Sequence, residues 1–199
     1  MEIRNYTPEY TEEIVELFNS SVHAIDSSIY SSKQKQAWAP TPPDYNQWRL
    51  RLANKKTYLA IINNKVAGFI VLEADGYIDC IFTHPEQEGK GVAYLLYSNV
   101  ELLAKARNMK ALYLDASIIA KPFFEHRGFV VLQESKIKKS GQVLINYSMK
   151  KLLDNSRSLS GNSYKDALHP ITQSIANCIP TQSLRTISFE EKCPSTNLE

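Results

Sequence analysis

The 199-residue chain lacks any run of about 18 consecutive apolar residues, the length that a membrane-spanning helix needs. We therefore expect neither a membrane segment nor a membrane partner. The first residues, Met1 to Tyr6, lack the pattern of a secretory leader and are typical of a strand. Charge is nearly balanced, with 23 Lys and Arg against 21 Asp and Glu, which gives no electrostatic reason to expect nucleic-acid binding.

Cysteine is scarce, and its three positions are scattered: Cys80, Cys178 and Cys193. An odd number without regular spacing indicates neither a disulfide framework nor a zinc site, so we expect no metal and a reducing, cytoplasmic location. Cys80 lies in an apolar stretch next to Asp79. Strand alternation predicts that the two side chains point to opposite faces and that Cys80 is a buried, unreactive thiol.

Glycine is also sparse, with seven residues in the chain, yet Gly89 and Gly91 stand close together before a long amphipathic stretch. Bare N–H groups at the positive end of a helix dipole bind phosphate, so this turn predicts a phosphorylated ligand. The nucleotide P-loop spacing is absent, and Tyr94 occupies the position where a dinucleotide fingerprint has its third glycine. At this point an ordinary turn before a helix remains an alternative.

The composition changes near residue 153. Residues 1–153 show dense periodic apolar patterning and are predicted to form one domain. Residues 154–199 are rich in Ser, Asn and Thr, so we expect a disordered extension that buries little apolar area, with at most a short helix around Pro170 to Cys178.

The patterning within residues 1–153 predicts alternating strands and helices of an α/β fold. The predicted strands are Ile3–Tyr6, Tyr58–Ile62, Val66–Leu72, Tyr77–Thr83, Ala111–Ala116, Phe129–Lys136 and Val143–Lys150. The first predicted helix begins after the cap Thr7, the second begins at Ser31 or Ser32, and the others span Asp44–Asn54, Glu88–Arg107 and Ile119–Arg127. The strand–helix–strand unit from Tyr77 to Ala116 is expected to be parallel with a right-handed crossover, inside an otherwise antiparallel sheet flanked by helices.

Two sequence blocks carry a family resemblance. Glu88 to Ala93 is similar to the signature turn Gln/Arg-x-x-Gly-x-Gly/Ala, and Ala120 to Phe129 is similar to a short helix that ends in Gly-Phe. With these blocks and the element order, residues 1–153 resemble the GNAT superfamily of acyl-CoA-dependent N-acetyltransferases. The stretch from Asp115 to Phe124 most resembles its YafP-like branch.

The resemblance implies acetyl-CoA as co-substrate and a set of donor-binding residues. The strand residues Ile81, Phe82 and Thr83 would border the pantetheine arm, lying between two splayed strands and pairing with the backbone of Ile81 and Thr83. Ser117 and Phe124 would border the thioester end. Backbone amides of the signature turn would hold the pyrophosphate: Glu88, Gly89, Lys90, Gly91, Val92 and Ala93.

The chain departs from the family pattern where chemistry is concerned. Glu88 places a carboxylate at the position of the signature Gln or Arg, and Ser117 replaces a common asparagine. Phe124 stands where many members carry a tyrosine that protonates the leaving thiolate, and phenylalanine has no proton to donate.

Four residues are candidates for the acceptor side. Asp79 is a carboxylate in an otherwise apolar strand, so it is a candidate base or substrate anchor, although a structural hydrogen bond would also explain it. Tyr77 shares its face by alternation and could relay a proton, contact the acceptor or simply pack. Tyr30 and Trp38 fall in the segment that would wall the acceptor site, where core packing is the alternative.

Two functions follow from different classes. The first is an N-acetyltransferase that moves acetyl from acetyl-CoA to a primary amine by direct attack on the thioester. The acceptor would be a small molecule or a peptide, and a homodimer is compatible with the sequence. The second is a non-catalytic acyl-CoA-binding module that kept the donor site and lost its acid, as Phe124 suggests.

Overall fold

The structure is a computed structural model that describes residues 1–154. The predicted disordered extension, apart from its first residue, and the predicted helix around Pro170 lie outside the described residues. Between residues 1 and 154, no helix is both long enough and apolar enough to cross a bilayer.

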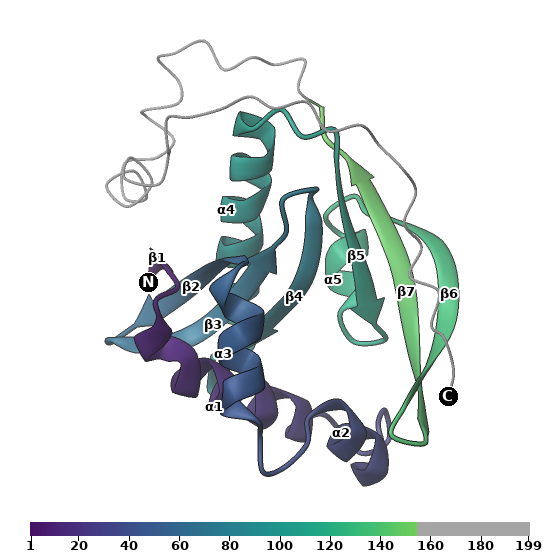
Figure 1. Cartoon of the computed structure of the whole chain (residues 1–199). Coiled ribbons are helices and arrows are strands. Elements are labelled where there is room, and N and C mark those ends of the chain that lie inside the picture. Colours follow the sequence, from purple (N-terminus) through teal and green to yellow (C-terminus); the bar gives the residue numbers. More distant parts are fainter. Residues whose placement is uncertain (155–199) are drawn as a thin grey trace.

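The centre of the fold is a seven-stranded sheet with the order β1-β2-β3-β4-β5-β7-β6 (Figure 1). Neighbouring strands are antiparallel except β4 and β5, which are parallel and are joined by helix α4. The predicted α/β class with one parallel unit is therefore confirmed. The strands are β1 Glu2–Asn5, β2 Lys56–Ile62, β3 Lys65–Leu72, β4 Tyr77–Thr83, β5 Ala111–Ser117, β6 Val130–Lys139 and β7 Gln142–Leu152.

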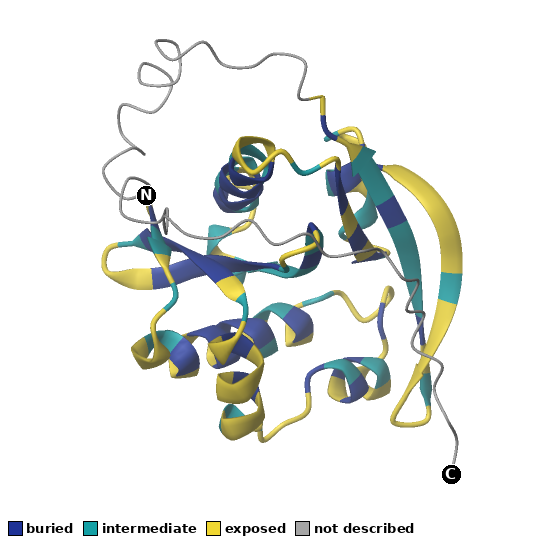
Figure 2. Ribbon diagram, turned by 45° about the horizontal axis from the view of Figure 1, so that its top comes forward, coloured by how far each residue is buried: buried dark blue, intermediate teal, exposed yellow. Residues whose placement is uncertain are grey.

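Helices cover both faces of the sheet (Figure 2). Helices α1 (Thr11–His23) and α3 (Tyr45–Ala53) pack on one face, and α4 (Val92–Ala106) packs on the other. The short α5 (Lys121–Glu125) packs against β5. Helix α2 (Ser32–Trp38) reaches across to β7, where Gln34 Nε2 donates to the Val143 carbonyl at 2.9 Å.

Two predicted helix starts are confirmed by their caps. Ser31 and Gln34 form a reciprocal capping box at the start of α2, and the Asp44 carboxylate accepts from the Gln47 amide at the start of α3. Thr7 is the N-cap residue of a 3-10 helix with Pro8 in its first turn, but it does not cap α1, and its hydroxyl donates to Glu9 instead of accepting from the backbone. A 3-10 turn at Pro8–Tyr10 intervenes, and α1 begins at Thr11.

Helix α4 begins four residues later than predicted, at Val92. Gly89 and Gly91 have φ angles of 72° and 81°, in the left-handed region that interrupts a right-handed helix. The residues from Glu88 to Gly91 therefore form a turn ahead of the helix. The first helical hydrogen bond runs from the Leu95 amide to the Gly91 carbonyl at 3.0 Å.

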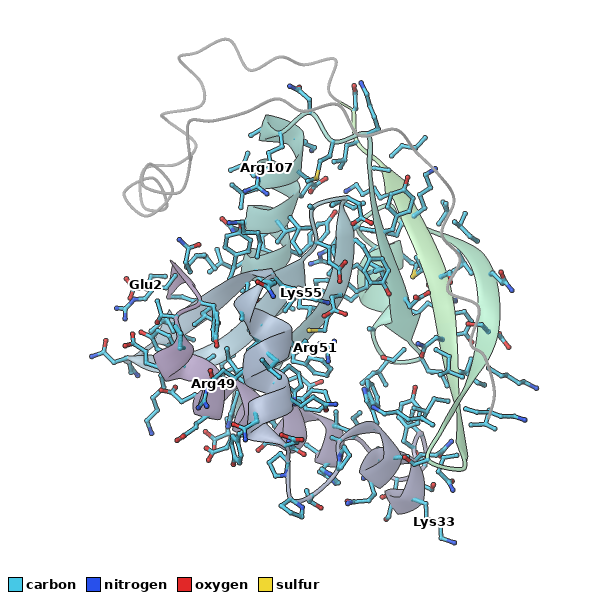
Figure 3. The ribbon with its side chains drawn as sticks, viewed as in Figure 1. Glu2, Lys33, Arg49, Arg51, Lys55 and Arg107 are labelled. Atoms are coloured by element: carbon cyan, nitrogen blue, oxygen red, sulfur yellow. The ribbon has the colours of Figure 1, made fainter. Side chains whose placement is uncertain are left out.

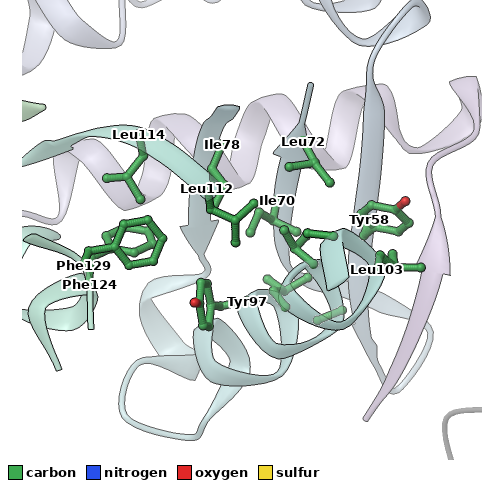
Figure 4. Packing of buried hydrophobic residues seen from close by; sticks show 14 of the residues in the cluster. Tyr58, Ile70, Leu72, Ile78, Tyr97, Leu103, Leu112, Leu114, Phe124 and Phe129 are labelled. Carbon is green, nitrogen blue, oxygen red and sulfur yellow. The ribbon is translucent and has the colours of Figure 1, made fainter. Parts of the chain in front are cut away.

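A hydrophobic core lies on each side of the sheet. Between the sheet and α4, a cluster contains Ile78, Leu114 and Tyr97 (Figure 4). On the side of α1 and α3, a second cluster contains Phe18 and Trp48, whose ring centroids lie 4.8 Å apart. Because both faces are packed, the central strands form a fixed frame for the residues at their ends.

Candidate active site

Strands β4 and β5 form a fork. They pair only at Tyr77 with Tyr113 and at Ile78 with Leu114, and then diverge (Figure 1). On its outer side β4 pairs with β3, and β5 pairs with β7 along its whole length. We call residues 79–83 and 115–117 the β4/β5 fork. Backbone groups that face into the fork have no ladder partner across it among residues 1–154, so they can pair with an extended ligand.

The β4 side of the fork presents the backbone of Ile81 and Thr83. The His84 amide donates to the Ala67 carbonyl of β3 at 2.9 Å. Because the backbone of an antiparallel strand alternates in direction, Phe82 also faces β3, whereas Ile81 and Thr83 face the fork. The Thr83 carbonyl accepts from the Ser21 hydroxyl of α1 at 2.6 Å, which leaves its second lone pair for a ligand.

The start of α4 presents backbone donors at the mouth of the fork. The amides of Val92, Ala93 and Tyr94 precede the first helical hydrogen bond and lie at the positive end of the helix dipole. The amides of Glu88 and Lys90 instead donate to the Pro85 and Gln87 carbonyls at 3.2 Å. This arrangement suits an anion that is bound by backbone rather than by charged side chains.

Asp79 is the extra residue of a β-bulge. Val71 of β3 pairs with Cys80 and Leu72 pairs with Ile78, so Asp79 has no partner on β3. Its Oδ2 accepts from Arg51 Nε and Nη2 at 3.1 and 2.9 Å.

Lys55 Nζ donates to the same oxygen of Asp79 at 3.0 Å. Figure 3 shows Arg51 and Lys55 on the side of α3 that faces β4, with Arg49 on the other side. The carboxylate of Asp79 is thus tied to two cations from the α3 segment.

The bulge changes the direction of Cys80. Regular alternation predicts opposite faces for Asp79 and Cys80, but this is wrong, because Cys80 packs against the cluster of α1 and α3 near Arg51. Burial raises the pKa of Cys80 to about 12. The raised pKa supports the prediction of an unreactive thiol, but Cys80 is half-buried rather than fully buried.

Tyr77 lies on the same face as Asp79, as predicted, and bonds across the fork. Its hydroxyl donates to Asp115 Oδ2 at 2.8 Å, while Ser148 Oγ of β7 donates to Asp115 Oδ1 at 2.5 Å. Burial, the bond to Asp115 and the nearby charge of Asp79 raise the pKa of Tyr77 well above its usual value. Tyr77 is therefore a neutral donor at physiological pH.

Sequence reasoning missed Asp115 and Ser148. Neither residue stands out in the sequence, because a short strand with one acidic residue is common. The parallel pairing of Tyr77 with Tyr113 is the signal that could have found Asp115, since continuing this register places Asp115 opposite Asp79. The Ser148 contact follows from the antiparallel register of β5 and β7.

Tyr30 and Trp38 lie together beside the two arms of the fork. Their ring centroids are 5.4 Å apart, and Trp38 lies 6.2 Å from Phe82 of β4. Tyr30 is buried, which raises the pKa of its hydroxyl, and the backbone amide of Ile118, just after β5, acts against this effect. The segment before and within α2 thus contacts the end of each fork strand.

A buried lysine holds this segment in place. Lys35 Nζ donates to the Ile25 carbonyl at 2.6 Å and to the His23 carbonyl at 3.3 Å. The ammonium group has backbone partners for its charge although it is buried, so it stabilises the connection between α1 and α2. The positions of Tyr30 and Trp38 depend on this connection.

Phe124 and Ser117 occupy the β5 side. Phe124 is only 2% exposed and packs against Phe129 and Tyr97 at centroid distances of 5.2 and 6.2 Å (Figure 4). Ser117 Oγ accepts from the Ala120 amide at 3.3 Å, so it caps the turn before α5. Ser117 remains half-buried at the open end of the fork.

The comparison with known families agrees with this arrangement of fork, turn and helix start. The profile described as an acetyltransferase (GNAT) domain matches residues 7–151. The chain belongs to the GNAT family of acetyltransferases. It is 35% identical over 150 residues to the uncharacterized N-acetyltransferase YafP of Escherichia coli K12, covering 75% of this chain and 95% of that protein.

Solved GNAT structures share the fold. A GCN5-related N-acetyltransferase from Rhodopseudomonas palustris has a TM-score of 0.72 and 32% identity, over 76% of this chain and 94% of that one. The PaiA N-acetyltransferase of Thermoplasma acidophilum, solved in complex with coenzyme A, has a TM-score of 0.62 and 19% identity, over 76% and 98% of the two chains.

Family membership decides between the two functions that the sequence left open. GNAT acetyltransferases use acetyl-CoA, so this chain is an acetyl-CoA-dependent acyltransferase. The non-catalytic acyl-CoA-binding module is not favoured.

Proposed function

We propose that the chain transfers acetyl from acetyl-CoA directly to a primary amine in the β4/β5 fork. The observation that carries this proposal is the divergence of β4 and β5 after Ile78 and Leu114. It opens two strand edges that lead from the start of α4 to the carboxylates beside Tyr77. A donor that lies along these edges would place its thioester next to those carboxylates.

The donor half of the proposal uses backbone groups. The amides of Gly89, Gly91, Val92 and Ala93 would bind the pyrophosphate, with Glu88 and Lys90 shaping the turn through their own backbone bonds. The backbone of Ile81 and Thr83 would pair with pantetheine, and Phe82 would support that strand from the far side.

The acceptor half uses the opposite face of the fork. Tyr30 and Trp38 would form an aromatic wall for the acceptor. Asp79 has two proposed roles, base or substrate anchor, and its three hydrogen bonds from Arg51 and Lys55 support the anchor. Taking up a proton would weaken both ion pairs, whereas an anchor uses the fixed negative charge as it stands.

The leaving thiolate receives no proton from position 124. The buried ring of Phe124 would instead pack beneath the thioester end, and Ser117 would lie at the border of that end. Holding the amine and the thioester in an attacking geometry supplies up to about 7 to 11 kcal/mol in ideal cases, so positioning can sustain transfer without a dedicated phenol. We therefore expect a modest turnover rather than an inactive protein.

The rest of the proposal concerns the acceptor, the cellular location, the catalytic domain and the oligomeric state. The acceptor is a small molecule or a peptide amine, and the scarcity of cysteine supports a cytoplasmic location. Residues 1–153 are proposed to act as one catalytic domain. A homodimer stays a prediction.

The test is release of coenzyme A from acetyl-CoA by the full chain with a panel of amines. The panel contains a diamine, an amino acid, a peptide with a free N-terminus and a peptide with one lysine. We expect release that depends on at least one amine, together with acetylated product by mass spectrometry. Tight acetyl-CoA binding by calorimetry, without release on any member of the panel, would refute the proposal.

A further inference from the structure

We propose that Asp115 binds the ammonium group of the acceptor and removes its proton. This inference rests on the proposed function, because it assigns a catalytic residue to the same fork. Nothing in the sequence distinguishes Asp115 from other acidic residues of the chain. Its position, its charge balance and its hydrogen-bond partners carry the assignment.

Position is the first argument. Asp115 follows Leu114, the last residue of β5 that pairs with β4, so it is the first residue of the β5 arm of the fork. Leu114 belongs to the core on the α4 side, so alternation directs Asp115 to the other face, where Tyr77 contacts it. Asp115 is exposed, so an acceptor can reach it.

Charge balance is the second argument. Asp79 is paired with Arg51 and Lys55, whereas no Lys or Arg of the described residues forms an ion pair with Asp115. Lys150 of β7, two residues beyond Ser148, places its Nζ 5.2 Å from the centre of the Tyr113 ring. The negative charge of Asp115 is thus left for a cationic ligand, and an amine acceptor is a cation at neutral pH.

The hydrogen-bond partners are the third argument. The hydroxyl groups of Tyr77 and Ser148 each donate a hydrogen bond to a different oxygen of Asp115. Neutral donors fix the orientation of a carboxylate without cancelling its charge, and each oxygen keeps a further lone pair for a ligand. Tyr77 and Ser148 are therefore positioning residues that act through Asp115.

The proposed step is a proton transfer to Asp115 followed by transfer of the acetyl group to the amine. The carboxylate of Asp115 takes one proton from the acceptor ammonium, and the freed nitrogen lone pair attacks the thioester carbonyl carbon. The tetrahedral intermediate collapses with cleavage of the carbon–sulfur bond, and the second nitrogen proton neutralises the thiolate. Asp115 then releases its proton to solvent, so the products are an amide, coenzyme A and one proton.

Several ionisable groups lie around the pair that Tyr77 and Asp115 form. Tyr77 has a raised pKa and stays neutral, and the raised pKa values of Arg51 and Lys55 keep both groups cationic. Asp79 on β4 and Glu73 just after β3 act on Tyr77, and the strand register places Tyr113 of β5 and Lys150 of β7 on the same face as Asp115. Tyr147 of β7 lies opposite Ala116 and packs against the core on the α4 side.

The experiment compares Asp115→Asn with the unmodified full chain, using the best amine from the panel. We expect kcat/KM for the amine to fall about 100-fold at neutral pH, within the usual range for loss of a general base. The difference should narrow by about tenfold per pH unit as pH rises towards the pKa of the chosen amine, which is about 10.4 for a lysine side chain, because the free amine then no longer needs a base. A purely structural defect would give a constant ratio at all pH values.

Two further variants keep the test decisive if Asp115→Asn folds poorly. Tyr77→Phe and Ser148→Ala should each lower kcat about tenfold with the KM for acetyl-CoA unchanged, since neither removes the charge. Glu134→Gln, at an exposed carboxylate of β6, is the matched control and should leave the kinetics unchanged.

The outcomes separate the inference from the proposed function. If the unmodified chain is active and Asp115→Asn keeps its rate and pH profile, Asp115 is not the base. If all three site variants keep normal rates, the positioning argument is also overturned. If the unmodified chain releases no coenzyme A with any amine, the proposed function fails before the variants are compared.

Discussion

Asp79 and Cys80 are consecutive residues of β4, yet both side chains lie on the face that α3 covers. The cause is the β-bulge opposite Val71 and Leu72, which leaves Asp79 without a partner on β3. The bulge brings the carboxylate to Arg51 and Lys55 and packs the half-buried thiol beside it. It occurs at the last paired residues of β4 and β5, so the same irregularity shapes the entrance of the fork.

Replacing Asp79 with Asn tests the ion-paired anchor. The side chain of Asp79 is 15% exposed, and the variant leaves Arg51 with a neutral partner and Lys55 with Glu73 alone, so we expect the free energy of unfolding to fall by about 1 to 2 kcal/mol. Turnover should fall at least about tenfold, because the entrance of the fork loses its fixed charge. Chemical denaturation and kinetics measure the two effects.

The control for Asp79 is Glu73→Gln, which removes the other carboxylate that Lys55 contacts. That variant should leave turnover nearly unchanged, because Asp79 keeps both cations. Normal turnover in a folded Asp79→Asn protein would rule out both the anchor and the base.

Replacing Gly91 with Ala tests the donor turn. A Cβ at Gly91 meets no atom within 4 Å, and φ is 81°, so the change costs about 1 to 2 kcal/mol in backbone strain without a clash. The open space beside it is where we propose that the pyrophosphate lies, so acetyl-CoA affinity should fall at least about tenfold. Calorimetric titration with coenzyme A measures it.

Gly141 offers a matched control. Its φ is 74° and its Cβ position is equally open, but it lies in the hairpin between β6 and β7. Gly141→Ala should lose similar stability and bind coenzyme A normally. Equal affinities for the two variants would argue against a phosphate site at the start of α4.

Cys80 should resist alkylation in the folded protein. Burial raises its pKa to about 12, so the reactive thiolate is nearly absent at about pH 8. We expect iodoacetamide to leave Cys80 unmodified in buffer and to modify it in urea, as judged by site-resolved mass spectrometry. Rapid alkylation without denaturant would show that the bulge region opens.

The carboxylate of Glu101 should make stability depend on pH. Burial alone would raise the pKa of Glu101, but the hydrogen bond and charge of Lys151 and the charge of Lys105 outweigh it and lower the pKa. A lowered pKa stabilises the fold above the unfolded value and loses that effect as pH falls. Glu101→Gln should therefore cost about 1 kcal/mol at neutral pH and almost nothing near pH 3.

Denaturation of the Glu101 variant and the unmodified chain at several pH values measures this difference. A constant gap between them from neutral pH to about pH 3 would show that packing, and not the charge of Glu101, is responsible.

Local signals in the sequence were sufficient for much of the fold. The capping residues Ser31 and Asp44 determine two helix starts through side chains within three residues. At Thr7 these local signals gave only part of the answer, because Thr7 begins a 3-10 helix rather than α1 and its hydroxyl donates to Glu9. The start of α4 was misplaced because Gly89 and Gly91 adopt left-handed backbone angles that no periodicity reveals.

The residues of the candidate site also fall into two groups, those that local sequence rules predict and those that they do not. Tyr77 and Asp79 could be found because alternation is a local rule and their strand is otherwise apolar. Arg51, Lys55 and Asp115 could not be found, since their contacts join residues 24 to 38 positions apart in the chain. Such contacts depend on strand register and on the angle of α3 to the sheet.

The sequence by itself determined the α/β fold, the family and the donor, because signature turn, strand patterning and helix caps are encoded in neighbouring residues. Only the tertiary structure decided which charges meet at the fork. Pairing along the sheet sets where β4 and β5 separate, and that separation places Asp115 beside Tyr77, where it forms no ion pair with any of the described residues.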